Sequence, residues 1–443
     1  MKEGFHLENI KIEHEFDVYL ESLDRLVSCP SVIDESGDKP FGKGINDALD
    51  TVLDIAKSWG YRTFKSEDGM YGYAEVGDSD IMMGVLGHVD VVSVGDVSKW
   101  TFDPFKVTLH EGMLYGRGVQ DDKGPVLANM FALKLLLDAG KTLKHTVRFI
   151  FGTDEESQWR CMDSYKKHER LPDYGITPDA DFPLVQVEKG TVSFLITDLL
   201  NRGEFLEGGV SGNAVPNAAR TKHSPELIDA LKQKNTPFEV QDDYLIVQGV
   251  AAHASTPEQG KNAIVKLIQA KKEIGELSPL EAFIDDLYSY PIFDRFYDNV
   301  SGYLTHNIGI VRTEDTLKYA TLDIRYPVSF EKFEIVSLVE KYASKHNLKV
   351  ETKGGLPSIQ LSEKSEVFRK LYEAYQEVTG DLKTKPLKIG GATYARAMPN
   401  IVAYGMLLPG APMTMHQVDE SISVDDVKTA IKIYATAFDK LVF

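Results

Sequence analysis

The sequence predicts an α/β fold, in which a discontinuous domain with a mostly parallel sheet covered by helices carries an inserted α+β domain. Apolar strand patterns at 80–92 and 145–156 alternate with amphipathic helix patterns, as parallel sheets require. The length of 443 residues also exceeds what one hydrophobic core usually organises, so two domains are expected. The helix patterns of this first part cover residues 17–28, 46–60 and 124–140.

The middle of the chain has a different order, in which a strand pattern is followed twice by a helix pattern. The segment "YLIVQGVAAHAS" (244–255) precedes a helix pattern at 260–275, and "LKYATLDIRYPVS" (317–329) precedes one at 330–347. We therefore expect the middle to form a separate domain with this different order of elements, inserted into the first domain.

The helix patterns of the last part are similar to those of the first part. A helix is predicted over 364–380 and another over 421–442, which Ser423 and Asp426 begin with a capping box. We therefore expect the discontinuous domain to comprise two separate stretches, with the inserted domain between them. The predicted boundaries are 1–186 and 358–443 for the discontinuous domain and 187–357 for the inserted one.

The amino-acid composition limits where in the cell the protein is expected and which kinds of partner it can bind. The formal charge of −18 disfavours nucleic acid or an anionic membrane as the main partner. No apolar run is long enough for a membrane helix, and the first 27 residues lack the apolar core of a signal peptide. The two cysteines, Cys29 and Cys161, are too few for a disulfide framework. These features predict a cytoplasmic protein without nucleic-acid or membrane partners.

The stretch "GHVD" places His88 and Asp90 at the end of an apolar strand pattern. Side chains two residues apart on a strand point to the same side. Asp90 can therefore hydrogen-bond the imidazole nitrogen that faces away from a metal ion. A single histidine at a strand end is more often structural, so this pair needs partners elsewhere.

Two acidic segments could supply such partners. "YGRGVQDDKGP" presents Asp121 and Asp122 just before a helix, where helix capping is an equally good explanation. "FGTDEES" places Glu155 and Glu156 after the apolar "VRFIF". A surface run of acids is the alternative there, but the strand before it is apolar enough to be interior. Crowded carboxylates without a cation would repel one another.

Two further loops, shaped by proline, contain Asp179 in "GITPDADFP" and His416 in "LLPGAPMTMHQVDE". Two histidines and three acids from five loops suit two divalent cations, held about 3.5–4 Å apart by a bridging carboxylate. Mixed imidazole and carboxylate ligands suit zinc, and also manganese or cobalt, and do not select one of these ions.

These motifs, in this order and spacing, resemble the dinuclear-zinc amidohydrolases of the aminoacylase and carboxypeptidase type. Within that family the chain looks most like the PepV-type dipeptidases, as "WRCMDSYKKHE" and "TPDADFP" indicate. The resemblance extends over essentially the full length. It implies that the discontinuous domain is catalytic and that the inserted domain is a lid.

The resemblance also implies roles for the clustered residues. Asp90 would orient a ligand histidine, and Glu155 would be the general base that takes a proton from the attacking water and later gives one to the leaving amine. The implied ligands are His88 and Asp179 for one cation, Glu156 and His416 for the other, and Asp121 as the bridge.

In the lid, "GVAAHASTPEQGKNAI" resembles the family segment whose histidine, here His253, stabilises the oxyanion. Asn213 and Arg325 correspond to residues that bind the substrate carboxylate, and Gly391 lies in a loop that lines the substrate pocket. The alternative for Arg325 is a structural ion pair with a carboxylate of the lid. PepV-type enzymes have a double lid module in the place of a second subunit, which implies a monomer.

The expected activity is metal-dependent hydrolysis of dipeptides with a free N-terminus. An N-acyl amino acid deacylase on the same scaffold is the nearest alternative. A metal-holding peptide-binding protein without catalysis is less favoured, because Asp90 and Glu155 are both present. A glycosidase that uses Glu155 and Asp121 would leave His88 and His416 unexplained.

Overall fold

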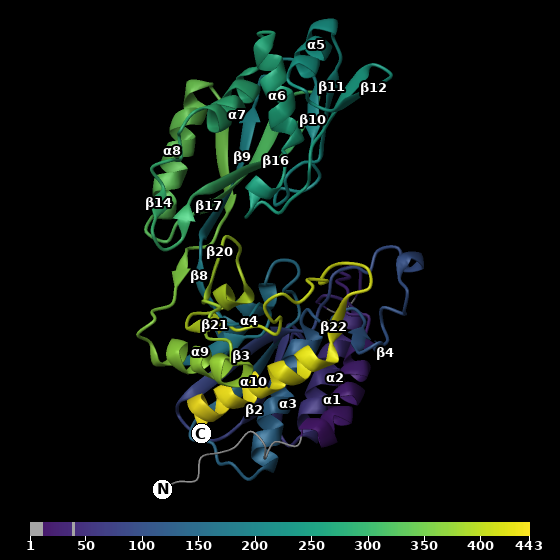
Figure 1. Cartoon of the computed structure of the whole chain (residues 1–443), viewed down its shortest axis with the longest axis vertical. Coiled ribbons are helices and arrows are strands. Elements are labelled where there is room, and N and C mark those ends of the chain that lie inside the picture. Colours follow the sequence, from purple (N-terminus) through teal and green to yellow (C-terminus); the bar gives the residue numbers. More distant parts are fainter. Residues whose placement is uncertain (1–11, 38–39) are drawn as a thin grey trace. The chain divides into compact units, whose positions relative to one another are not determined.

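The computed structural model describes residues 12–37 and 40–443, which fold into two compact units (Figure 1). The first unit comprises the described part of Met1–Gln186 with Leu361–Leu387 and Thr393–Phe443. The second comprises Val187–Gln360 and Lys388–Ala392. The first eleven residues belong to the stretch predicted to lack a signal peptide, and they lie outside the described residues.

The first unit contains a six-stranded sheet in the order β1-β2-β6-β3-β7-β21. Strands β6, β3, β7 and β21 run parallel to their neighbours in that group, whereas β1 and β2 add an antiparallel pair at one edge. The predicted mostly parallel sheet is therefore confirmed. The strands are β1 (Arg62–Lys65), β2 (Tyr71–Val76), β3 (Met82–His88), β6 (Thr146–Gly152), β7 (Tyr174–Thr177) and β21 (Ile401–Ala403).

Helices cover both faces of this sheet. Helices α2 and α3 pack on one face, and α4 packs on the other (Figure 1). Helix α10 packs against α3 and α9, and the side chain of Ser423 accepts the backbone N–H of Asp426, which is one half of the predicted capping box. The helices of this unit are α1 (Ile12–Val27), α2 (Lys43–Ser58), α3 (Lys123–Asp138), α4 (Arg160–His168), α9 (Glu366–Thr379) and α10 (Val424–Val442).

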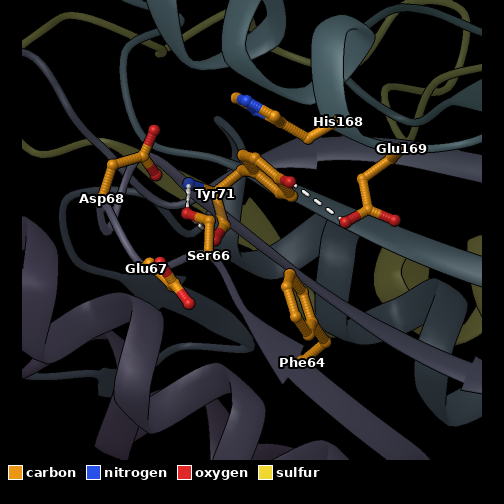
Figure 2. A pocket seen from close by; sticks show the side chains of 7 residues that line it. All are labelled: Phe64, Ser66, Glu67, Asp68, Tyr71, His168 and Glu169. Atoms are coloured by element: carbon orange, nitrogen blue, oxygen red, sulfur yellow. Dashed lines mark hydrogen bonds between the residues drawn. The ribbon is translucent and has the colours of Figure 1, made fainter.

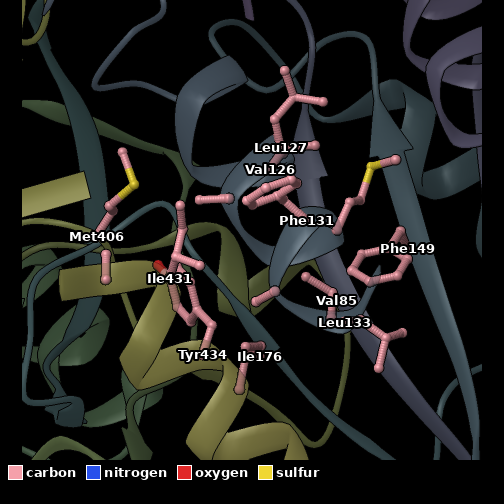
Figure 3. Close-up of a cluster of buried hydrophobic side chains, with 14 of the residues drawn as sticks. Val85, Val126, Leu127, Phe131, Leu133, Phe149, Ile176, Met406, Ile431 and Tyr434 are labelled. Atoms are coloured by element: carbon pink, nitrogen blue, oxygen red, sulfur yellow. The ribbon is translucent and has the colours of Figure 1, made fainter. Parts of the chain in front are cut away.

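The core of the first unit lies between the sheet and helices α3 and α10 (Figure 3). Val85, Phe149 and Ile176 come from three neighbouring strands, and Phe131 and Ile431 come from the two helices. All five side chains are buried, and burial of each large apolar side chain contributes about 1.5–3 kcal/mol. This packing fixes the ends of β3, β6 and β7, from which the candidate site is built.

The second unit is an antiparallel sheet in the order β12-β13-β11-β10-β16-β17-β9-β18, packed with four helices. The strands are β9 (Gly190–Asp198), β10 (Leu206–Gly208), β11 (Ala218–Lys222), β12 (Phe238–Gln241), β13 (Tyr244–Gln248), β16 (Thr305–Thr313), β17 (Lys318–Tyr326) and β18 (Lys349–Gly354). The helices are α5 (Pro225–Gln233), α6 (Ala263–Glu273), α7 (Pro279–Ser289) and α8 (Lys332–Lys345). This unit confirms the predicted α+β class.

The strand predicted over 244–255 is shorter than expected, because β13 ends at Gln248. Gly249 lies so close to another backbone segment that a Cβ there would be 2.1 Å from the carbonyl oxygen of Lys261. The chain therefore leaves the sheet at this glycine, and His253 lies in the loop that follows.

Short elements complete both units. None of the helices in the described ranges combines the length and the apolar character that a membrane crossing requires. The remaining strands are β4 (Thr108–His110), β5 (Met113–Tyr115), β8 (Val185–Glu188), β14 (Tyr297–Asp298), β15 (Gly302–Tyr303), β19 (Ile359–Gln360), β20 (Leu387–Ile389) and β22 (Ser421–Ser423). The 3₁₀ helices are η2 (Val97–Lys99), η3 (Pro257–Gln259) and η4 (Tyr394–Ala397).

Candidate active site

The candidate site lies at the carboxyl ends of three neighbouring parallel strands in the first unit. His88 ends β3, Glu155 and Glu156 follow β6, and Asp179 follows β7. Ligands of open α/β sheets bind outside this edge. The sheet topology thus brings together residues that are far apart in the sequence.

Asp121 lies between the two histidines. Its Oδ1 is 3.0 Å from Nε2 of His88, and its Oδ2 is 3.0 Å from Nε2 of His416. Asp179 Oδ2 is 3.8 Å from His88 Nε2, and Glu156 Oε1 is 3.0 Å from His416 Nε2. One carboxylate therefore connects two groups of possible ligands.

Two sets of three side chains have ligand atoms within 4.8 Å of one another: His88, Glu155 and Asp179, and Asp121, Glu156 and His416. Imidazole and carboxylate donors of this kind fit divalent cations such as zinc or manganese. The buried atoms His88 Nε2 and Asp121 Oδ1 have no hydrogen-bond partner among the described residues, although they face each other. Atoms buried in this way are suited to a cation between them.

Glu155 differs from the expectation in one respect. The sequence assigns it to proton transfer, whereas its carboxylate lies within ligand distance of His88 and Asp179. A general base must also lie close to the cations, because it acts on water beside them. The geometry is compatible with either duty, and the role of Glu155 stays a prediction.

Asp90 contacts the imidazole of His88. Its Nδ1 lies 3.0 Å from the backbone oxygen of Asp90 and 3.5 Å from the Oδ1 of that residue. The nearer, backbone contact turns Nε2 towards the carboxylates. The Oδ2 of Asp90 accepts a hydrogen bond of 3.0 Å from the backbone N–H of Glu156. Asp90 thus connects the ends of β3 and β6.

Burial and charge crowding shift the ionisation of the cluster. Burial raises the pKa of Glu155 to about 7, and burial together with the Asp121 charge raises the pKa of Asp179. Burial alone would raise the pKa of Asp121, but the neighbouring imidazoles of His416 and His88 lower it. Hydrogen bonds with Asp121 and Glu156 raise the pKa of His416 to about 10. A buried site with this excess of carboxylates favours bound cations.

Asp122 does not cap helix α3 with its side chain, although it occupies the N-cap position. Its buried Oδ2 accepts a hydrogen bond of 3.0 Å from the backbone N–H of His88. Gly87 makes room for this contact, because a Cβ there would lie 2.6 Å from Oδ2 of Asp122 and 2.2 Å from Val126. Asp122 therefore holds the end of β3 in place.

Sequence reasoning missed two residues that hold the loops of Asp121 and His416. The carboxylate of Glu420 is buried and pairs with Arg117 at 2.6 Å. The side chain of Gln120 accepts hydrogen bonds of 2.8 Å from the backbone N–H groups of Thr414 and Met415. Both residues lie in quoted motifs, but their backbone partners are invisible in a sequence.

His253 lies in the second unit, in the loop after β13. Its Nδ1 lies 2.6 Å from the hydroxyl of Ser255 and accepts the backbone N–H of that residue at 3.1 Å. Because Nδ1 accepts this N–H, the imidazole proton of the neutral ring is on Nε2. Burial and the charge of Arg325 lower the pKa of His253, which favours the neutral ring.

The other predicted substrate residues also lie in the second unit. Arg325 pairs with Asp323 through Nε at 2.7 Å and Nη2 at 3.1 Å, which is the ion pair that the sequence left open as its alternative. Asn213 is exposed and contacts the hydroxyl of Ser211. Gly391 belongs to the segment 388–392, which packs with this unit.

A separate hollow of about 370 Å³ lies in the first unit (Figure 2). Its lining residues are Phe64, Ser66, Glu67, Asp68, Tyr71, His168 and Glu169. The Tyr71 hydroxyl donates to Glu169 at 3.1 Å, and Asp68 accepts the hydroxyl of Ser164 at 2.7 Å. None of the predicted site residues is in this lining, so the hollow is distinct from the candidate site.

Known proteins are similar to this chain over nearly its whole length. Residues 84–440 match the family model described as Peptidase family M20/M25/M40. A protein of Bacillus subtilis (strain 168) named "Putative dipeptidase YtjP" is 35% identical over 443 aligned residues, covering 93% of this chain and 94% of that protein. "Putative dipeptidase MW1694" of Staphylococcus aureus (strain MW2) is 30% identical, covering 97% of this chain and 98% of that protein.

Solved structures share the fold. The dipeptidase Dug1p of Saccharomyces cerevisiae has a TM-score of 0.62 at 16% identity, covering 98% of both chains. Human carnosine dipeptidase 1 has a TM-score of 0.60 at 16% identity, covering 99% of both chains. Likeness at this identity shows the fold alone, whereas the family match extends through every motif quoted above. The resemblance is thus confirmed, and this chain is an enzyme of the peptidase family M20/M25/M40.

Proposed function

We propose that this enzyme is a dipeptidase that hydrolyses the peptide bond of short peptides with a free N-terminus. The observation that carries the proposal is the position of Asp121, whose two carboxylate oxygens each lie 3.0 Å from a different histidine. This arrangement suits a pair of divalent cations, which peptide hydrolysis at such sites uses. The dipeptidase names of the Bacillus and Staphylococcus relatives support the substrate class.

Five residues would hold the two cations, with zinc as the preferred ion and manganese or cobalt as alternatives. When bound, divalent cations lower the pKa of water towards neutrality and polarise the peptide carbonyl. The proposed ligands are His88 and Asp179 for one cation, Glu156 and His416 for the other, and Asp121 for both. Asp90 would keep His88 in the ligating tautomer, which its backbone contact of 3.0 Å supports.

Glu155 would be the general base. Its carboxylate would accept a proton from the attacking water and then donate it to the nitrogen of the leaving amine. The half-buried position of Glu155 supports this role, because burial raises its pKa to about 7, close to the working range of a base at neutral pH. The adjacent Glu156 contacts His416 instead, so the two glutamates have different surroundings.

The second unit would contribute substrate contacts. The Nε2–H of His253 would donate a hydrogen bond to the oxyanion, which the contacts of Ser255 with Nδ1 support. Arg325 and Asn213 would bind the substrate carboxylate, and Gly391 would line the pocket, as the family resemblance implies. Because Asp323 already pairs with Arg325, a substrate carboxylate would share or displace that pair.

The remaining assignments are proposals of the same kind. Residues 1–186 and 358–443 would form the catalytic domain and residues 187–357 the lid. The enzyme would be a cytoplasmic monomer, and the free thiols of Cys29 and Cys161 support a reducing compartment.

The test is hydrolysis of a free dipeptide and of its N-acetylated twin by metal-stripped enzyme, with zinc, manganese or cobalt added back. Metal-dependent cleavage of the free dipeptide alone is expected, and it would also identify the activating ion. Cleavage of the acetylated compound alone would replace the proposal with an N-acyl amino acid deacylase. Cleavage of neither compound would reject both activities.

A further inference from the structure

Trp159 lies beside Glu155 in the loop between β6 and α4. Its indole N–H donates a hydrogen bond of 3.1 Å to Oε1 of Glu155. Indole nitrogen is a donor only, so it can neither take up the proton that a general base accepts nor ligate a cation. It is therefore a group that can orient a catalytic carboxylate without competing with it.

The backbone of Trp159 is held in an uncommon conformation. Its φ of 59° lies in the left-handed region, which a bulky side chain rarely adopts. The buried Asp154 fixes it from both sides, since its carbonyl accepts the N–H of Trp159 at 2.9 Å and its Oδ2 accepts the N–H of Arg160 at 2.9 Å. Backbone strain that is maintained in this way is typical of functional sites.

The ring of Trp159 is fixed as well. It packs against the ring of Tyr394, with a centroid distance of 5.5 Å and an interplanar angle of 63°. Tyr394 is fully buried and contacts the imidazole of His88 edge to face. Gly152 leaves the space for Tyr394, because a Cβ there would lie 2.1 Å from its hydroxyl oxygen. Backbone and ring together direct the indole N–H towards Glu155.

We propose that Trp159 is a positioning residue, which holds Oε1 of Glu155 so that Oε2 is presented to the reacting water. The inference rests on the proposed function, in which Glu155 is the general base. A base must lie within hydrogen-bond reach of the proton that it accepts, so a free rotation of its carboxylate would lower the rate. Residues that hold an active-site side chain by a hydrogen bond, without touching the substrate, typically contribute about 10–100-fold to activity.

The first test is Trp159→Phe, which retains an aromatic ring against Tyr394 and removes the N–H. The left-handed backbone is no more demanding for Phe than for Trp. We expect kcat to fall about 10–100-fold, with KM and the number of bound cations unchanged. A kcat equal to that of the wild type would overturn the proposal, as would loss of a cation in proportion to the lost activity.

Trp100→Phe is the matched control. The indole of Trp100 donates a hydrogen bond of 2.9 Å to the carbonyl oxygen of Val94, so this variant removes a comparable bond in the same unit. We expect wild-type kinetics. An equal fall of kcat in both variants would show that the loss of any indole hydrogen bond in this unit lowers activity. This result would overturn the specific role of Trp159.

A double-mutant cycle identifies the residue through which Trp159 acts. Glu155→Gln removes the base, so adding Trp159→Phe to it should cause no further loss of kcat. A further fall of about 10-fold would show that Trp159 acts on another group, and this would contradict the proposal.

The last test needs no turnover and remains informative if Trp159→Phe does not fold. The chain contains three tryptophans, so their indole N–H signals can be assigned in ¹⁵N-labelled protein with Trp59→Phe and Trp100→Phe. Glu155→Ala should move the Trp159 signal upfield and leave the other two in place. An unmoved signal would overturn the hydrogen bond itself, whereas inactivity of the wild type towards dipeptides would overturn only the proposed function.

Discussion

The backbone N–H of Asp121 donates a hydrogen bond of 3.2 Å to Oε1 of Glu420, across 299 residues of sequence. The same oxygen accepts the N–H groups of Gly118 at 3.0 Å and Gln120 at 2.9 Å. One buried carboxylate thus organises the loop that presents Asp121 to both histidines. The geometry of the candidate site depends on a residue that lies outside it.

Glu420→Gln is expected to destabilise the enzyme by about 3–5 kcal/mol, because it leaves the buried guanidinium of Arg117 without an opposite charge. Looser placement of Asp121 should also weaken cation binding. Urea unfolding and calorimetric zinc titration measure the two effects. Glu377→Gln is the control, since its ion pair with Lys440 is half exposed and should contribute less than about 1 kcal/mol. Equal stability of both variants would contradict this role of Glu420.

The two adjacent glutamates are expected to respond differently to the same change. Glu155→Gln should retain both cations and lose about 10²–10⁴-fold in kcat, because a proton acceptor is lost. Glu156→Gln should lose a cation, because its carboxylate lies 3.0 Å from His416 in the second ligand set. Metal analysis of the dialysed variants together with kcat decides between them. Cation loss in the Glu155 variant alone would mean that the two duties are exchanged.

Much of the site could be predicted because it lies at the ends of apolar strands. The runs before His88 and Glu155 are largely apolar, so their carboxyl ends could be located, and parallel pairing of β3 with β6 brings those ends together. Asp121 and His416 lie in loops with no periodic pattern. The spacing of residues does not place such loops, so their link to the strand ends depended on the chemistry of the combined ligand set and on the family resemblance.

The parts that could not be predicted depend on contacts between distant backbone groups. Strand β1 is short and mostly exposed, so its antiparallel pairing with β2 has no apolar pattern to reveal it. Glu420 and Trp159 are ordinary acidic and aromatic residues in the sequence. The importance of Glu420 comes from backbone N–H groups of a distant loop, which become its neighbours only in the folded chain. The importance of Trp159 comes from Glu155 in its own loop, which a left-handed backbone that no sequence pattern reveals brings within hydrogen-bond reach.

His253 is expected to act through Nε2, since Ser255 occupies Nδ1. His253→Ala should lower kcat about 10²–10³-fold, the usual loss for one oxyanion donor, with the bound cations unchanged. Steady-state kinetics with metal analysis checks this. His223→Ala is the control, because His223 is an exposed histidine of the same unit. A rise in KM without a fall in kcat would assign His253 to substrate binding instead.

His306 makes the stability of the second unit depend on pH. Its half-buried ring lies between Tyr288 and Phe293, and burial lowers its pKa to about 4. The unfolded chain binds a proton at this residue below about pH 6.5, whereas the folded chain does so only near pH 4. Protonation therefore favours the unfolded chain in this window, and stability falls as the pH is lowered from 6.5 to 4.

Between pH 7 and pH 5 this residue should remove about 2 kcal/mol of stability. His306→Phe retains a ring between the two aromatic side chains and cannot be protonated. It also replaces Nε2, which has no hydrogen-bond partner among the described residues. Urea unfolding at both pH values should therefore show a smaller loss for the variant than for the wild type, by about that amount. His223→Phe should leave the loss unchanged, and equal losses in His306→Phe and the wild type would mean that His306 is protonated in the folded unit.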